Sequence, residues 1–273
     1  MSRLRRALCL GPLSMLVGCA RCDPPQPPPR PREPTLRVAP DPAAPASGRR
    51  VVAVGQIAQT WHVGAWAPAS ITLTDVAPGD AIVVLGAYWG DLEARSSTEP
   101  TDDQGELRRV LDQGPATVGR KKPPVFAQLY VELDPAPGAH TIVPAYLGGP
   151  AGDGTLYVAQ VRGLTERRVV GTGESWVRGS HIPEIAVATD RPAETGDLVI
   201  ALAGYDNVDQ RDHSGFSHPP AGWIALGLND DAANNVPSEL CYRAAPAPGD
   251  QTLAWTWTDP SVNVAAAVIA ALR

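Results

Sequence analysis

Short runs of apolar and β-branched residues, bounded by Gly, Pro and Asp, recur along the chain from about residue 51 onward. Runs of this kind predict β-strands. They lie at 51–57, 71–74, 81–88, 125–133, 141–146 and 156–161, and again at 185–189, 198–204, 224–228, 240–243, 252–258 and 262–272. This density is typical of an all-β sandwich or barrel, and we expect an antiparallel, jelly-roll-like β-sandwich.

The two sets of predicted strands match each other in order. Pro78-Gly79-Asp80 and its apolar run match Thr195-Gly196-Asp197 and its run, 117 positions later. Pro135-Ala136-Pro137-Gly138 matches Pro246-Ala247-Pro248-Gly249 at a shift of 111, and Gly163-Leu164 matches Ala271-Leu272 at a shift of 108. In each Gly-Asp turn, Gly is expected to adopt positive φ and Asp to bond its own backbone. The chain is therefore predicted to contain pseudo-repeats at about 70–164 and 185–272.

The halves are expected to need each other. One half has too few strands to bury two faces, so we expect two similar halves to face each other over a shared core. The runs that follow the two Gly-Asp turns are apolar at nearly every position, as expected for central strands buried on both faces. The predicted folded part is one β-sandwich domain over residues 49–273.

The N-terminus has the pattern of an export signal. Three arginines at positions 3, 5 and 6 precede an apolar stretch over 7–17, which ends in Leu16-Val17-Gly18-Cys19. This segment resembles the signal peptide and lipobox of bacterial lipoproteins. The resemblance implies that residues 1–18 are removed and that Cys19 carries the lipid on its sulfur and amino group. The alternative is an ordinary signal peptide that is cut elsewhere. Ala20, where an inner-membrane retention signal has Asp, favours the outer membrane by the same analogy.

Residues 19–48 are predicted to be a Pro-rich tether. Ten prolines lie within 23–46. Such a run favours a polyproline II spacer of roughly 70 Å at ~3.1 Å per residue. A Pro-rich recognition ligand is the alternative. The spacer is the simpler prediction because a lipid anchor has to be held away from the folded body.

Composition excludes several classes of protein. The formal net charge is −6 and no basic stripe occurs, so no nucleic-acid partner is expected. No apolar run reaches the ~18 residues of a membrane-spanning helix. After export and lipidation, Cys22 and Cys241 remain, and whether they pair stays open. No Cys/His pairing has the spacing of a zinc site, so no zinc site is predicted.

The order of motifs in the folded part resembles a largely uncharacterised bacterial extracellular module. The matching features are the Gly-Asp strand, the turn at Thr101-Asp102-Asp103-Gln104-Gly105, the Pro-Ala-Pro-Gly turn, and Val161-Arg162-Gly163-Leu164. The resemblance covers about residues 70–273 and implies a β-sandwich without agreed catalytic residues. Glu106 and Arg162 depart from the family pattern, which often has Asn and Ser there.

Two groups of residues are candidate binding sites. Trp89 and Trp176 lie next to turn-like segments and are candidates for ligand contact, because an exposed indole ring stacks on a sugar. Leu253, Trp255 and Trp257 share one strand face and are expected in the core. Asp206, Asp209 and Asp212 follow a strand and form a candidate Ca²⁺-binding loop, although their spacing fits no EF-hand and a solvated loop is the simpler interpretation. The pair Asp102-Asp103 is interpreted as hairpin chemistry.

No catalytic set is recognisable. The chain has five histidines but no Gly-x-Ser-x-Gly elbow and no phosphate-binding loop, so we do not expect an enzyme. We expect a cell-envelope protein, anchored by lipid in the outer membrane, that binds a glycan or an envelope protein through a non-catalytic module. The alternatives are a structural or assembly component of the envelope and an unrecognised hydrolase.

Overall fold

The computed structural model describes residues 34, 36–40, 52–63, 69–89, 99–113, 125–144, 153–206, 222–229, 236–257 and 262–273. The regular elements of these residues are the strands β1 (Arg37–Val38), β2 (Ala53–Val63), β3 (Ile71–Val76), β4 (Ala81–Trp89), β5 (Thr101–Asp102), β6 (Arg108–Gln113), β7 (Val125–Glu132), β8 (Gly138–Val143), β9 (Asp153–Arg162), β10 (Val169–Arg178), β11 (Glu184–Ala188), β12 (Leu198–Tyr205), β13 (Ile224–Asn229), β14 (Ser238–Ala244), β15 (Thr252–Thr256) and β16 (Val264–Leu272). Among the described residues, none belongs to a helix with the length and apolar character to cross a membrane.

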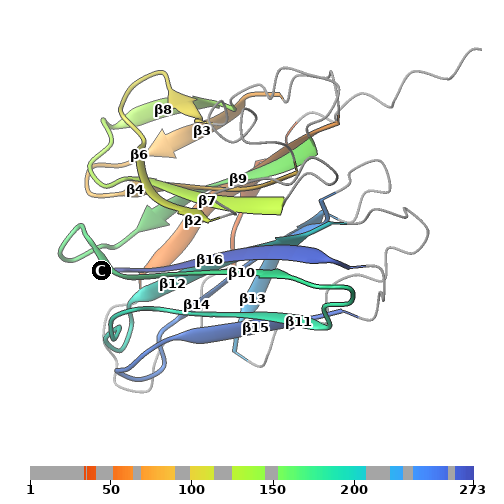
Figure 1. The fold of residues 1–273 in the computed structure, drawn as a ribbon. Helices are drawn as coiled ribbons and strands as arrows, with labels where there is room; N and C mark the ends of the chain where they lie inside the picture. Colours follow the sequence, from red (N-terminus) through yellow and green to blue (C-terminus); the bar gives the residue numbers. More distant parts are fainter. Residues whose placement is uncertain are drawn as a thin grey trace, which may run out of the picture.

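The strands form four sheets that stack as layers (Figure 1). The two large sheets have the orders β1-β2-β9-β4-β7-β6 and β10-β16-β12-β14-β13. The small sheets β3-β8-β5 and β11-β15 lie on the outside, at the top and bottom of the figure. The strand pairs of these sheets are antiparallel. The prediction of an all-β, antiparallel sandwich is confirmed.

Each half has a jelly-roll-like strand order, except that its fifth strand extends the large sheet beside the sixth instead of joining the small sheet. Numbered within the first half, β2 to β9 form the orders 1-8-3-6-5 in the large sheet and 2-7-4 in the small one. The second half repeats this arrangement, because β10-β16-β12-β14-β13 corresponds position by position to β2-β9-β4-β7-β6, and β11-β15 corresponds to β3-β8. A counterpart of β5 would fall between β12 and β13, where residues 207–221 lie outside the described residues.

The ladder register corrects one part of the predicted repeat. Ala81 in β4 pairs with Val161, and its counterpart Leu198 in β12 pairs with Leu272. Val161 is therefore the counterpart of Leu272, at a shift of 111, and the predicted match of Gly163-Leu164 at a shift of 108 is wrong by three residues. The cause is the run of Ala and Val in β16, which offers several equally good matches until strand pairing selects one.

The Gly-Asp turns have the predicted geometry. Gly79 and Gly196 have φ of 87° and 91°. Asp80 Oδ2 accepts a hydrogen bond from Ala77 N at 2.8 Å, and Asp197 Oδ2 accepts one from Glu194 N at 2.7 Å. Both carboxylates are buried at the same position of their jelly rolls.

The corrected register also aligns Arg162 with Arg273, and the two arginines differ. Arg273 donates two hydrogen bonds to the Asp197 carboxylate, at 3.0 and 2.8 Å, and both side chains are more than nine-tenths buried. Arg162 is 44% exposed and its Nε lies 3.9 Å from Asp80 Oδ2. In the first half, Gln160 Nε2 donates to Asp80 Oδ2 at 2.6 Å instead.

Three hydrophobic cores separate the four layers. The shared core lies between the two large sheets and includes Leu85 from β4 and Leu202 from β12. The opposite face of β4 packs against β3 and β8, and that of β12 packs against β11 and β15. The sequence predicted one shared core because a half seemed to have too few strands. The structure differs, since each half has a second layer that covers its outer face.

Small residues allow the two central strands to approach each other. A Cβ atom on Gly204 of β12 would lie 2.7 Å from the Cβ of Ala87 in β4. These two residues are counterparts, 117 positions apart, so equivalent points of the halves meet at the shared core. The ends of β4 and β12 therefore lie on the same side of the molecule.

Four strands were not predicted from the sequence, and all four lie at sheet edges. β1, β6 and β10 are edge strands of the large sheets, and β5 is a two-residue edge strand of a small sheet. Edge strands carry charged residues and glycines that weaken the alternation of apolar and polar positions, as in the Arg-Arg start of β6. The prediction therefore found the buried strands and missed exposed ones.

Part of the predicted tether belongs to the folded body. Arg37 and Val38 pair with Ile57 and Gln56 of β2. Ala39 is buried in the shared core, and its N–H donates to Gly55 O at 2.8 Å. The Tyr242 hydroxyl of the second half donates to Pro40 O. The predicted boundary at residue 48 is thus corrected.

Replacing Arg273 by Ala is expected to lower the free energy of unfolding by about 3–5 kcal/mol, because it leaves the buried Asp197 carboxylate without its cation. Arg162→Ala is the matched control from the other half. It is expected to cost about 0–1 kcal/mol, because Arg162 is exposed and Gln160 already satisfies Asp80. Urea unfolding of both variants measures the difference, and equal losses would contradict this account.

Candidate functional site

A carboxylate–histidine cluster lies inside the first jelly roll. Asp102 comes from β5, His140 from β8 and Glu132 from the end of β7, and their potential ligand atoms all lie within 4.8 Å of one another. The side chains of Asp102 and His140 are fully buried. Since β5 and β8 belong to the outer sheet and β7 to the large sheet, the cluster joins the two layers of this half.

Both ring nitrogens of His140 are held at short distances. Nε2 lies 2.6 Å from Ala136 O, and Nδ1 lies 2.6 Å from Asp102 Oδ2. A carbonyl oxygen only accepts hydrogen bonds, so Nε2 carries a proton and donates. The other oxygen of Asp102 accepts from Gln104 N at 3.1 Å, which is the hairpin bond expected of this residue.

The surroundings shift the pKa values of two members of the cluster. Burial, together with the hydrogen bond to Asp102 and the charge of that carboxylate, raises the pKa of Glu132 to about 7, and the charge of His140 opposes this shift. Burial lowers the pKa of His140, but the bonds to Ala136 O and Asp102 outweigh this effect, so the net pKa is raised. Both shifts therefore favour the protonated forms of Glu132 and His140 relative to the free side chains.

The second jelly roll has a different set of residues at the same place. At the shift of 111, Arg243 is the counterpart of Glu132, Gln251 of His140 and Ala247 of Ala136. Gln251 Nε2 donates to Ala247 O at 3.4 Å and to Gly249 O at 3.0 Å, and its Oε1 accepts from Arg243 Nη2 at 2.8 Å. An amide thus holds the second Pro-Ala-Pro-Gly turn as the imidazole holds the first.

The sequence analysis did not assemble this cluster. It interpreted Asp102 as a hairpin residue, counted His140 only among the histidines and did not single out Glu132. These residues are separated by up to 38 positions and meet only when β5, β7 and β8 are layered. The available signal was the repeat itself, since His140 and Gln251 stand two positions after the glycine of matching turns.

The two candidate tryptophans come together at one end of the stack. Trp89 pairs with Val125 in the ladder between β4 and β7, and Trp176 Nε1 donates to Val125 O at 3.1 Å. Both rings are partly buried against the shared core. They are therefore less exposed than the sequence analysis expected. Leu253, Trp255 and Trp257 are buried in the outer core of the second half, as predicted.

Asp206 has a structural bonding pattern. Its Oδ1 accepts hydrogen bonds from the N–H groups of Asn263 at 2.9 Å and Val264 at 2.7 Å, so this carboxylate holds the start of β16 against the end of β12. The other two residues of the predicted Ca²⁺ loop, Asp209 and Asp212, lie outside the described residues.

The remaining cysteine predictions fall mostly outside the described residues. Cys19 and Cys22 are not among them. Cys241 is a free, buried thiol in β14. Burial raises the pKa of this thiol, which keeps it protonated and unreactive.

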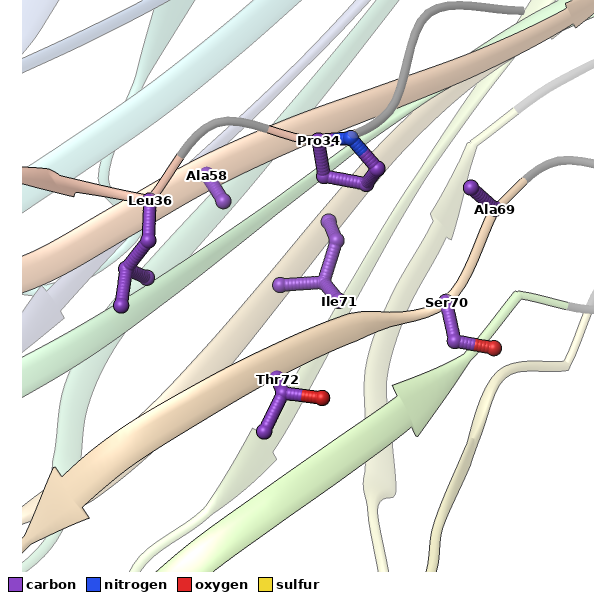
Figure 2. A pocket seen from close by; sticks show the side chains of 7 residues that line it. All are labelled: Pro34, Leu36, Ala58, Ala69, Ser70, Ile71 and Thr72. Carbon is purple, nitrogen blue, oxygen red and sulfur yellow. The ribbon is translucent and has the colours of Figure 1, made fainter.

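Two pockets open on the surface of the first half. One, of about 530 Å³, lies beside the Gly79-Asp80 turn and is lined by Asp75, Arg162 and Leu164 among others. The other, of about 360 Å³, is shown in Figure 2. Pro34 and Leu36 of the N-terminal segment lie on one side of it, and Ile71 and Thr72 of β3 line another. This second pocket depends on the docking of the N-terminal segment.

No protein-family model, no curated protein and no solved structure matches this chain. The resemblances to a lipoprotein signal and to a bacterial extracellular module therefore stay predictions.

His140→Gln is expected to preserve the fold, because Gln251 already performs the same turn contact in the second half. We expect a loss of less than about 1 kcal/mol for Gln, against about 1–3 kcal/mol for His140→Ala, which leaves the turn carbonyl unsatisfied. Urea unfolding of the two variants checks this order. A Gln variant as unstable as the Ala variant would show that the imidazole itself is needed for folding.

Proposed function

We propose that this chain is a lipid-anchored protein of a bacterial cell envelope whose paired jelly rolls bind a glycan or an envelope protein without catalysing a reaction. The anchor rests on the Leu16-Val17-Gly18-Cys19 motif and on the Pro-rich segment behind it. The binding role rests on the loop-bearing end of the body. We define the loop end as the end at which β4 stops and β7 and β9 begin.

The observation that carries the binding role is the convergence of Trp89 and Trp176 at the loop end. Trp89 pairs with both Val125 and Asp153, so the first and last residues of three strands lie side by side there. Trp176 comes from the other jelly roll and reaches the same place through Val125 O. A surface that both halves build is a suitable platform for a ligand with an apolar ring face.

The lengths of the segments that connect the strands also favour the loop end as the binding surface. Residues 90–100 and 114–124 connect strands at the loop end with 11 residues each, and 144–152 with nine. At the opposite end, the turns 77–80 and 133–137 have four and five residues. Binding residues are concentrated on long loops that a rigid scaffold positions. The loop end is therefore the better candidate for a partner.

Assembly and hydrolysis have less support in the described part of the chain. Among these residues, the exposed large hydrophobic side chains are Val38 and Val143, which form no broad apolar patch of the kind that an assembly surface needs. Asp102 and His140 are fully buried, so no substrate reaches them without a rearrangement of the half. A non-catalytic binding role fits both observations.

Cys19→Ala is expected to move the exported protein from the detergent phase to the aqueous phase, since it removes the thiol to which the lipid is attached. Detergent phase partitioning of the wild type and the variant measures this. Cys241→Ala is a matched control, because that cysteine is buried in β14, and it is expected to partition like the wild type. Unchanged partitioning of Cys19→Ala would refute lipidation.

A glycan array and a pull-down against envelope proteins test the binding role on the full chain. Once a partner is found, Trp89→Ala is expected to weaken its binding by at least about tenfold, as expected for an aromatic residue at the centre of a contact. Glu166→Ala, at the opposite end of the stack, is the control and should bind normally. Loss of binding by both variants, or by neither, would place the partner elsewhere, and the absence of any partner would favour assembly.

A further inference from the structure

The cluster of Asp102, Glu132 and His140 brings three potential metal-ligand atoms within 4.8 Å of one another. Because His140 Nε2 donates its proton to Ala136 O, the lone pair of a neutral imidazole lies on Nδ1. That atom faces Asp102 Oδ2 at 2.6 Å. Two hydrogen-bond acceptors do not approach this closely unless a proton lies between them, so a metal ion that binds here would replace that proton.

Glu132 contributes a third donor. Its Oε2 atom is buried and has no hydrogen-bond partner. Its carboxyl group packs against the backbone of Gly105, where an added Cβ would lie 1.9 Å from Oε1. Because Gly105 has no side chain, the Glu132 carboxyl group fits beside Asp102. Its Oε2 atom is left without a hydrogen bond.

Comparison of the two halves shows that the turn can be held without the residues of this cluster. The second jelly roll has Arg243 in place of Glu132 and Gln251 in place of His140, and holds the same turn with an amide. It has a cationic side chain where the first half has a carboxyl group. The turn therefore requires neither an imidazole nor a glutamate at these two positions, and the described residues of the second half place no metal-ligating carboxylate or imidazole where Glu132 and His140 stand in the first.

We propose that Asp102 Oδ2, Glu132 Oε2 and His140 Nδ1 bind a divalent transition-metal ion of the zinc type. One imidazole nitrogen and two carboxylate oxygens are ligands that zinc and its neighbours accept, usually in sets of three or four. Donation of the other ring N–H to a backbone carbonyl is the arrangement that orients a metal-binding histidine. Ca²⁺ is a poor fit, since it prefers six to eight oxygen ligands.

Metal binding would require small movements and the loss of protons. Zinc bonds of about 2.0–2.1 Å place neighbouring ligand atoms roughly 3.3 Å apart in a tetrahedral site. The Asp102 and His140 atoms would therefore separate slightly, while Glu132 would move closer. The proton on His140 Nδ1, and any proton on Glu132, would pass to solvent as the ion enters. The site lies at the end of the first half opposite the loop end, beside the turn 133–137. The metal proposal therefore does not rest on the proposed binding role of the loop end.

The test is a titration of the full chain with Co²⁺ after treatment with a chelator and its removal. We expect saturable binding with a visible Co²⁺ absorption, displacement by Zn²⁺ and no displacement by Ca²⁺ at the same concentration. His140→Gln is expected to weaken Co²⁺ binding by at least about 100-fold, the upper range for loss of even an outer partner of a ligand. His181→Gln, at an exposed position in the second half, is the matched control and should bind Co²⁺ normally.

Three outcomes would overturn the proposal: no saturable Co²⁺ signal in the wild type, equal Co²⁺ affinity in wild type and His140→Gln, or displacement by Ca²⁺. Circular dichroism of each variant verifies the fold first. If His140→Gln does not fold, Glu132→Gln replaces it, since the amide keeps the size of the side chain and removes the anionic oxygen. Unchanged Co²⁺ binding by a folded Glu132→Gln variant would equally reject this ligand set.

Discussion

The shared core between the two large sheets is the contact on which the rest of the structure depends. The inward faces of β4 and β12 contribute Leu85 and Leu202 to it, and the close approach of Ala87 and Gly204 sets how tightly the sheets meet. Because equivalent residues of the two halves lie opposite each other, the ends of corresponding strands lie on the same side. This is why Trp176 of the second half reaches the backbone of the first half at Val125. Without this packing, the loop-bearing ends of the two jelly rolls would not form one surface.

The duplication also makes each half a control for the other. Asp80 and Asp197 accept the same turn hydrogen bond, so this turn is a feature that the two halves share. The halves differ in how that carboxylate is balanced: Arg273 pairs with Asp197 directly, whereas Gln160 satisfies Asp80. In the first half, the side-chain amide of Gln160 supplies a hydrogen bond to Asp80, so this carboxylate is satisfied without a direct arginine hydrogen bond. The larger difference, a carboxyl group in place of Arg243 near the turn, changes the sign of the charge inside a buried site, and charge inside a core is costly unless it has a partner.

The N-terminal segment connects the proposed anchor to both halves. Ala39 is buried in the shared core and Pro40 accepts a hydrogen bond from Tyr242 of the second half. The segment crosses the first half at the edge of β2, where it also forms one side of the pocket in Figure 2. A pull on the proposed lipid anchor would therefore act on the interface between the jelly rolls.

The sequence by itself determined the features that depend on near neighbours. Turn chemistry at Gly79-Asp80 and Gly196-Asp197, the doubly apolar runs of β4 and β12, and the buried Leu253-Trp255-Trp257 stripe follow from local backbone preferences and alternation of side chains. Only the tertiary structure decided the register in which the Ala-rich strand β16 pairs with β12. This register aligns Arg162 with Arg273. It also decided the docking of residues 36–40 and the meeting of Asp102, Glu132 and His140. These features require closure of long loops and layering of sheets, and no local pattern encodes the partner of a residue that lies a layer away.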